Sequence, residues 1–161
     1  MSTPHIPENS DSRVEQSLCA ALRAANRAVT QFYDLVLAPT DLKATQFVAL
    51  QAIEECGEIA QCEFARSHAV AVETLSRRFS GLRRKGYIQA RTGNRHGERI
   101  YSLTEKGRQA LRDAAPYWER AQERLRTVLG ENDWRIMLEM LDRLRAAAFR
   151  AEKLRTENHV H

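Results

Sequence analysis

The sequence predicts a mainly α-helical fold with one small β-hairpin. The 161 residues are 43% hydrophobic and 29% charged but include only seven Gly and four Pro, a composition that suits helices better than a sandwich or a disordered chain. Apolar residues recur at intervals of three and four along most of the chain, as on one face of a helix. The exception lies around residue 93. There, two segments in which apolar and polar residues alternate flank a Gly-rich turn, and this pattern predicts the hairpin.

Length and composition also exclude several classes of protein. A chain of this size can bury one sizeable core, so we expect one compact unit. No run approaches 18 apolar residues, so no membrane partner is expected. The N-terminus lacks the basic start and apolar core of a secretory signal. Cys19, Cys56 and Cys62 are odd in number and widely spaced, which argues against a disulfide framework and favours a reducing, cytoplasmic location.

The first predicted helix is long. Residues 1–11 are polar with two Pro and are expected to be flexible. Ser12 and Glu15 have the spacing of a capping box, so a helix should run from there to about residue 38, before Pro39. A wide apolar face follows it: Val14, Leu18, Leu22, Ala25, Val29, Phe32 and Val36. Such a terminal helix often completes its core with a second chain, so residues 12–39 are predicted to form a dimerisation helix.

The middle of the chain predicts three shorter helices. They cover about 44–56, 59–68 and 71–85, and Gly57 and Gly86 stand where left-handed C-terminal caps would lie. Their expected inward residues follow the helical period: Phe47, Leu50 and Ile53; Phe64 and Ala65; Leu75, Phe79 and Leu82.

The last third predicts the hairpin and two more long helices. Strands are expected over 87–91 and 99–103, with Gly93, Asn94 and Gly97 in the turn. Thr104 should cap a fifth helix over 105–129, closed by Gly130, and Asn132 a sixth over 133–155. The sixth carries an apolar side: Trp134, Ile136, Met137, Met140, Leu141, Leu144 and Phe149. Residues 105–155 are therefore predicted to join the dimerisation helices, and 156–161 to fray.

Basic charge is concentrated in one region. Between Arg77 and Arg108 the sequence holds ten Arg and Lys against two Glu, a local charge of +8 in a chain whose total is +4. A helix with an apolar stripe and Arg on its other sides, followed by an Arg-bearing hairpin, has the outline of a DNA-binding surface. Residues 40–104 are thus predicted to bind double-stranded DNA.

The third and fourth predicted helices have the spacing of a helix-turn-helix, whose second helix lies in the major groove. Thr74 and Ser76 can hydrogen-bond base edges, and Arg77 or Arg78 can contact guanine or phosphate. The hairpin would place its arginines beside the minor groove or its phosphates. The DNA-binding candidates are Thr74, Ser76, Arg77, Arg78, Arg84, Arg91, Arg95 and Arg99. Any one Arg also fits a merely solvated face, with Glu73 and Arg77 as a helical i,i+4 pair.

The sequence resembles the MarR family of winged helix-turn-helix transcription regulators. The resemblance rests on LKATQFVAL at 42–50, FA at 64–65, TLSR at 74–77, LRRKGYI at 82–88 and SLTEKG at 102–107, and extends over about 17–150. It implies a homodimer in which the first, fifth and sixth helices interlock. Each subunit then presents one recognition helix and one wing to half of a near-palindromic site, most often as a repressor. A small-molecule effector is expected between the dimer helices and the winged domain.

Two positions depart from that family's pattern. The wing usually carries an Asp-x-Arg pair that orients the wing arginine, whereas this chain has RHGER at 95–99 without an Asp. Either Glu98 takes over that role or Arg99 is shifted, which leaves open which Arg enters the groove. Ala60 stands where the third helix usually has a Ser or Thr cap, at a cost of about 1 kcal/mol.

The first helix is also similar to that of the OhrR-type hydroperoxide sensors within this family, in which a Cys is oxidised. Cys19 holds the position of that Cys and Tyr33 matches one of its two tyrosine partners, while Arg23 replaces the other. A nearby Arg can itself lower a thiol pKa. The other interpretation of Cys19 is a small apolar residue on the dimer helix. Neither Cys56, Cys62 nor His68 has metal-ligand spacing, so no metal and no cofactor is expected.

Two other functional classes were weighed. An enzyme would need a nucleophile–base pair, a Gly-rich phosphate loop or clustered carboxylates, and the sequence shows none of these. A winged-helix module that binds another protein and not DNA remains the alternative. Several phosphate contacts would make DNA affinity fall steeply with salt, which such a module would not show.

Overall fold

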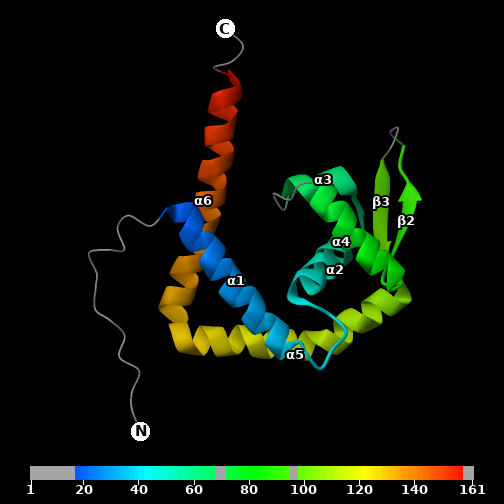
Figure 1. Cartoon of the computed structure of the whole chain (residues 1–161), viewed down its shortest axis with the longest axis horizontal. Coiled ribbons are helices and arrows are strands. Elements are labelled where there is room, and N and C mark those ends of the chain that lie inside the picture. Colours follow the sequence, from blue (N-terminus) through cyan, green and yellow to red (C-terminus); the bar gives the residue numbers. More distant parts are fainter. Residues whose placement is uncertain (1–16, 68–71, 95–97, 158–161) are drawn as a thin grey trace. The chain divides into compact units, whose positions relative to one another are not determined.

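The computed structural model describes residues 17–67, 72–94 and 98–157. The elements in chain order are α1 (Leu18–Val36), α2 (Ala44–Cys56), β1 (Glu58–Ala60), α3 (Gln61–Ser67), α4 (Val72–Arg84), β2 (Ile88–Thr92), β3 (Arg99–Leu103), α5 (Glu105–Leu129) and α6 (Glu131–Glu157) (Figure 1). The predicted mainly helical fold with a hairpin is confirmed. Contacts divide the chain into two compact units, with the boundary inside α5 between Trp118 and Glu119.

Glycines with positive φ end three of the helices. Gly57, Gly86 and Gly130 have φ values of 70°, 76° and 82°, a conformation that costs glycine little because it has no Cβ. After α4 the Gly86 amide donates to the Arg83 carbonyl (2.8 Å) and the Tyr87 amide to the Leu82 carbonyl (3.0 Å). These two bonds form a Schellman motif. The C-terminal cap predicted at Gly86 and the end of the fifth helix at Gly130 are confirmed, whereas Gly57 ends α2 with a ψ of −55°, outside the left-handed conformation predicted for it.

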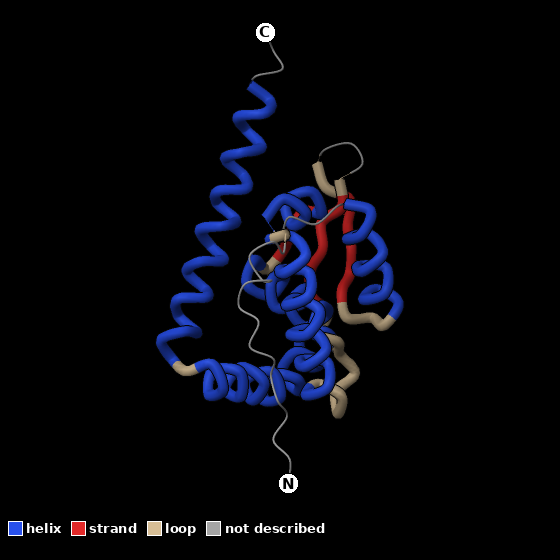
Figure 2. The backbone as a smooth tube through the Cα atoms, turned by 60° about the vertical axis from the view of Figure 1, so that its left-hand side comes forward, coloured by secondary structure: helices blue, strands red, loops and turns tan. Residues whose placement is uncertain are grey.

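The sheet has three strands where the sequence predicted two. The strand order is β1-β3-β2, with both pairs antiparallel, and the three strands lie side by side (Figure 2). The prediction that Ile59 begins the third helix was wrong: Ile59 pairs with Tyr101 of β3, and α3 begins at Gln61. Ile59 is buried between two more exposed neighbours, so a strand buries its side chain while β3 supplies backbone partners.

Two helix ends also differ from expectation. α1 ends at Val36, two residues earlier than predicted; the Leu37 amide still donates to the Tyr33 carbonyl (2.8 Å), and the Leu37 carbonyl then accepts from the Thr40 amide and hydroxyl (both 2.8 Å). The prediction that Asn132 caps the sixth helix was wrong, since α6 begins at Glu131 and Trp134 already donates to the Gly130 carbonyl (3.0 Å). The predicted capping pair Ser12 and Glu15 lies outside the described residues.

The core of the winged part centres on the inner face of α4. Leu75, Phe79 and Leu82 are at most 1% exposed, as the helical spacing predicted. The ring of Phe79 lies edge-on between Phe64 of α3 (5.2 Å) and Tyr101 of β3 (4.5 Å). α4 is therefore fixed by contacts from α3 and the sheet, with its opposite side left to solvent.

A second aromatic cluster joins α1, α2 and the first half of α5. The Trp118 ring stacks on Phe47 at 4.4 Å and lies 4.3 Å from Tyr33. Pro116 lies inside α5, two residues before Trp118. Proline removes one helical hydrogen bond, so α5 is locally weakened two residues before the unit boundary at Trp118.

The second unit consists of the end of α5 followed by α6. Arg126 links the end of α5 to the start of α6. Its Nε lies 3.6 Å from a Glu131 carboxylate oxygen, and its guanidinium carbon lies 5.7 Å from the Trp134 ring centroid. Large apolar side chains of α6 are 40–56% exposed in the single chain, namely Ile136, Met137, Leu138, Met140, Leu141 and Phe149. No helix among the described residues is long and apolar enough to span a membrane.

Candidate nucleic-acid interface

The contacts of Gln61 fix the start of α3 against α4 and the sheet. Its amide nitrogen donates to the Ser76 hydroxyl oxygen (2.5 Å), and its amide oxygen accepts from the Tyr101 hydroxyl (3.3 Å). Ser76 is half-buried, as is Thr74. The Ser76 oxygen thus accepts a hydrogen bond within the protein. Residues 68–71, with His68, lie outside the described residues.

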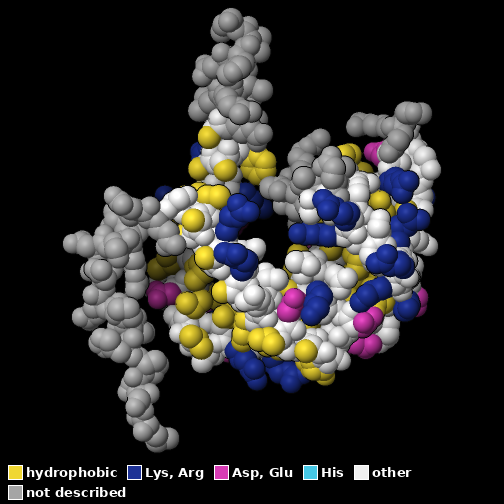
Figure 3. Space-filling view, viewed as in Figure 1, with side chains coloured by type: hydrophobic (Ala, Val, Ile, Leu, Met, Phe, Trp, Pro, Cys, Tyr) yellow, Lys and Arg dark blue, Asp and Glu magenta, His cyan; other side chains and the backbone are white. Residues whose placement is uncertain are grey.

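Arg77 and Arg78 lie on the exposed side of α4. Within the described part of the chain neither guanidinium forms a hydrogen bond or ion pair. Arg83 and Arg84 follow in the last turn, where positive charge interacts favourably with the helix dipole. Lys and Arg side chains spread over this part of the surface (Figure 3). The face of α4 opposite its core is therefore positively charged and uncompensated.

The wing arginines differ in their surroundings. Arg91 of β2 makes a two-point ion pair with Glu58 of β1, at 2.6 and 3.2 Å. The hydrogen bond between them raises the pKa of Arg91 and lowers that of Glu58. Arg99 of β3 is exposed opposite Thr92, with no ion pair among the described residues. Arg95 lies outside them.

Glu98 pairs with Gly93 where the two wing strands meet their connecting loop. Its carbonyl accepts from the Gly93 amide (2.9 Å), and its carboxylate lies so close to Gly93 that a Cβ there would overlap it. Glu98 also contributes to the raised pKa of Arg91 through its charge. An acidic residue thus stands beside the wing arginines.

A network around Tyr87, not foreseen from the sequence, connects the end of α4 to the loop before α2. The Tyr87 hydroxyl donates to an Asp41 carboxylate oxygen (2.6 Å), and the Lys85 ammonium to the Asp41 carbonyl (2.7 Å). Burial, followed by this Asp41 hydrogen bond, raises the pKa of Tyr87 to about 12. The bonds from Tyr87 and Lys85 lower the pKa of Asp41. Because 46 positions separate the partners, no local pattern signals the contact.

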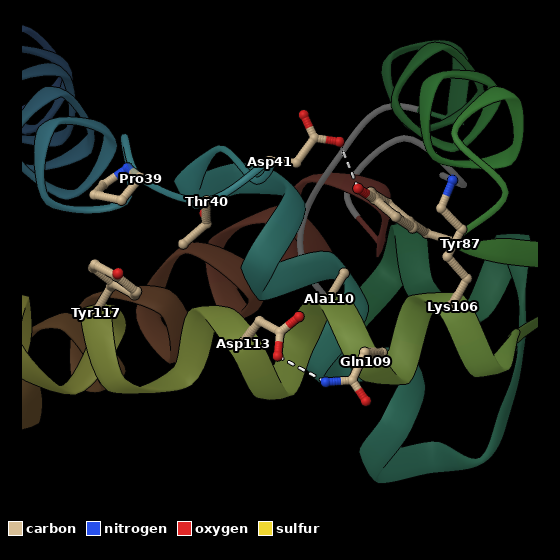
Figure 4. Close-up of a pocket in the computed structure, with 9 residues that line it drawn as sticks. All are labelled: Pro39, Thr40, Asp41, Tyr87, Lys106, Gln109, Ala110, Asp113 and Tyr117. Atoms are coloured by element: carbon tan, nitrogen blue, oxygen red, sulfur yellow. Dashed lines mark hydrogen bonds between the residues drawn. The ribbon is translucent and has the colours of Figure 1, made fainter.

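A pocket of about 420 Å³ opens beside this network (Figure 4). Its lining comes from the loop before α2, from Tyr87 and from one side of α5: Pro39, Thr40, Asp41, Tyr87, Lys106, Gln109, Ala110, Asp113 and Tyr117. On the α5 side Gln109 donates to the Asp113 carboxylate (2.7 Å). Two tyrosines, two carboxylates and one ammonium therefore surround a space large enough for a small aromatic molecule.

The structure does not bring Cys19 and Tyr33 together within one chain. Both lie on α1, 14 residues apart, which is roughly 21 Å along a helix axis. Cys19 and Arg23 are exposed, whereas Tyr33 is buried against Trp118 and its burial raises its pKa. Cys56 and Cys62 are exposed too. Among the described residues no group of three His, Cys, Asp or Glu could hold a metal ion.

Comparison with known proteins identifies the fold's relatives. No family model and no curated protein matches the chain. Among solved structures, the chain is similar to the M. tuberculosis transcriptional regulator MosR in complex with DNA, at 32% identity over 83% of this chain and 96% of that one, with a TM-score of 0.75. A second MosR structure gives 33% identity over the same shares, with a TM-score of 0.71.

An E. coli MarR mutant in complex with operator DNA, at 18% identity, covers 85% of this chain and 99% of its own length with a TM-score of 0.73, which shows the shared fold. These relatives are transcriptional regulators and not enzymes. With the helix-turn-helix and wing described above, they establish that the chain belongs to the MarR family of winged-helix transcriptional regulators.

Proposed function

We propose that the protein is a sequence-specific DNA-binding regulator, acting as a homodimeric repressor on a near-palindromic site in the cytoplasm. The observation that carries the proposal is the exposed face of α4, where Arg77 and Arg78 have no carboxylate partner among the described residues. Uncompensated guanidinium groups on a recognition helix are suited to guanine edges and phosphates. One of the two MosR structures and the MarR structure named above are of DNA complexes, which supports DNA as the partner.

We infer that the two described wing arginines contribute unequally to DNA binding. Arg91 is held by Glu58, so a phosphate would have to displace a two-point ion pair. Arg99 has no such competitor among the described residues. We infer that Arg99 is the stronger DNA contact of the two, and that Arg91 chiefly braces β2 against β1.

Dimerisation follows from the apolar faces that the single chain leaves exposed. Leu18 and Leu35 of α1 are 60% and 75% exposed, and α6 carries the longer apolar row described above. A second copy of the chain would bury these faces and set two α4 helices on one duplex. Two half-sites should then lie about one helical turn apart, roughly 34 Å.

We further propose that a small aromatic effector occupies the pocket beside Tyr87. Tyr87 directly follows the cap glycine Gly86 and its amide completes the α4 cap, so a molecule that displaces its ring also disturbs the end of the recognition helix. A ligand that binds better to the displaced state shifts the population away from DNA binding. Oxidation of Cys19 is the other proposed signal, and it is tested by whether a Cys19→Ser variant still leaves DNA on peroxide treatment.

The DNA proposal is tested with the purified full-length protein. Selection from a random duplex library should recover a near-palindrome with half-sites one turn apart. On that site, Arg77→Ala should weaken binding by about 1–3 kcal/mol, or roughly 5- to 150-fold, and relax the preference at one position. Arg124→Ala, an exposed change on α5, is the matched control and should leave affinity unchanged.

The alternative is a module that binds protein and not DNA. It predicts no enriched sequence and no steep salt dependence of DNA affinity between about 50 and 200 mM salt. Finding neither in the wild-type protein would reject the proposed function.

A further inference from the structure

A small groove lies between α2 and α4, on the exposed side of the recognition helix. Its volume is about 200 Å³, and its lining comes from the start of α2 with the residue before it, and from α4: Lys43, Thr45, Gln46 and Ala49, then Arg77, Arg78, Gly81 and Leu82. We propose that this groove binds one phosphodiester of the DNA backbone, so that the N-terminal turn of α2 is part of the DNA-binding surface. The inference rests on the proposed DNA-binding function and extends it to α2.

The charge of the lining selects an anion. Lys43, Arg77 and Arg78 bring three positive charges to the groove, and no carboxylate lines it. The two guanidinium groups are not neutralised by the described residues. Elsewhere on the described surface, Arg91, Arg112 and Arg135 each pair with a Glu. The groove therefore holds three cations with no carboxylate partner among the described residues, as is also true of Arg99 on the wing.

The first turn of α2 adds polar groups to the groove. Its helix dipole adds little attraction for an anion, because amides at this helix end already have hydrogen-bond partners. The Lys43 amide already donates to the Gln46 side chain (3.0 Å), and the Ala44 amide to an Asp34 carboxylate (2.7 Å). Asp34 therefore offsets part of the positive helix end. The attraction for an anion rests on the three cations, while the exposed Thr45 hydroxyl supplies a hydrogen-bond donor.

A glycine inside α4 is the independent observation that points to an occupant. Gly81 lies in the last turn of α4, which ends at Arg84, and glycine in a helix costs up to about 1 kcal/mol relative to alanine. Its φ is not positive, and a Cβ added there meets nothing within 4 Å. Neither backbone conformation nor packing against the protein explains the missing side chain. The glycine leaves the groove open at this point, which is the space that the proposal assigns to the phosphate.

The position of the groove selects DNA as the source of the phosphate. A major groove about 12 Å wide is filled by a helix with its side chains, so a sugar–phosphate strand runs along each flank of a docked helix. The groove occupies one flank of α4, beside Arg77. A strand passing there meets Lys43 and Thr45 while Arg77 reaches the bases. Phosphate contacts of this kind fix the register of the helix on the duplex.

Two variants test the proposal by fluorescence anisotropy with the full-length protein and its selected duplex. Lys43→Gln should lower the slope of log affinity against log salt by about 0.9, equally on specific and unrelated duplexes. Gly81→Leu should fill the groove and weaken DNA binding at least tenfold while raising the melting temperature. Arg124→Gln is the control for loss of a charge and should change neither slope nor affinity.

A methylphosphonate scan of the duplex identifies the contact directly. One neutralised phosphate per half-site should weaken the wild-type protein but cause no further loss in Lys43→Gln. If the wild-type protein binds DNA and no phosphate shows this coupling, the groove does not contact the backbone and the inference is rejected. Release of DNA by inorganic phosphate beyond that by chloride at equal ionic strength, with a flat scan, would instead assign the groove to a free anion. Failure of the wild-type protein to bind any duplex would reject the proposed function itself.

Discussion

Tyr87 is the residue on which most connections of the winged part converge. Its amide completes the cap of α4, its carbonyl accepts from the Thr104 amide (3.0 Å), and its hydroxyl donates to Asp41. The ammonium groups of Lys85 and Lys106 lie 5.8 and 5.4 Å from its ring centroid, within the range of cation–π attraction. One side chain thus links the recognition helix, the loop before α2 and the start of α5.

The raised pKa of Tyr87 predicts a loss of stability at high pH. The folded protein holds the phenol proton more tightly than the unfolded chain, whose tyrosines titrate near pH 10. The contribution of Tyr87 is therefore complete below about pH 10 and disappears as the pH rises to about 12. A shift from 10 to about 12 corresponds to at most about 2–3 kcal/mol.

Urea unfolding of the wild-type protein and Tyr87→Phe between pH 8 and 12 measures this effect. The difference in unfolding free energy between the two proteins should shrink across that range, since other titrating groups are common to both. A constant difference would contradict the assignment. Asp41 acts in the opposite direction: its lowered pKa means that its contribution is present above about pH 4 and is lost as the pH falls.

The elements predicted best from the sequence are the helices whose ends are set by neighbouring residues. α2 and α5 begin and end where expected, because the glycine after each helix can adopt a conformation that other residues avoid. β1 was missed because a three-residue strand is defined by its partner β3, about 40 positions away. Asn132 has a good capping side chain, yet the turn at Gly130 lets α6 begin before it. Nonlocal pairing therefore limits what a sequence pattern can place.

The junction between β2 and α5 predicts the effect of a single methyl group. A Cβ added at Gly107 would overlap the carbonyl of Tyr87, which is backbone and cannot move aside. Gly107→Ala should therefore destabilise the protein by about 1–3 kcal/mol, although alanine favours helices. Gly81→Ala is the matched control, since its added Cβ meets nothing, and should stabilise by about 0.5–1 kcal/mol. Denaturant midpoints measure both, and equal shifts would show that Gly107 is not close-packed.

For the whole molecule, the family and the fold class were predicted from the sequence and are confirmed by MosR at 32% identity. The division into dimerisation and DNA-binding segments, and the individual DNA-contact residues, stay predictions. Of the candidates, the structure places Ser76 and Arg91 in internal contacts and leaves Arg77, Arg78 and Arg99 exposed. The Arg77 and Lys43 variants above address them.

The exposed apolar row of α6 predicts how the proposed dimer can be broken. Met137 and Leu141 lie one turn apart and are 40% and 44% exposed. Replacing both by Lys should prevent association, because burying charged side chains without partners is costly. Sedimentation at micromolar concentration should show a monomer, whereas Arg143→Glu, on the opposite side of the helix, should remain dimeric. A dimeric double variant would place the interface elsewhere.

The close contact between Gly107 and the Tyr87 carbonyl has a mechanical consequence. With the Thr104 hydroxyl also donating to the Gly86 carbonyl (2.6 Å), the end of α4 and the start of α5 behave as parts of one stiff lever. The recognition helix cannot rotate without carrying the first turns of α5 with it. Any signal that alters the distance between two recognition helices must therefore bend the lever farther along its length. Pro116, which interrupts the hydrogen bonding of α5, is the nearest position at which that helix can bend.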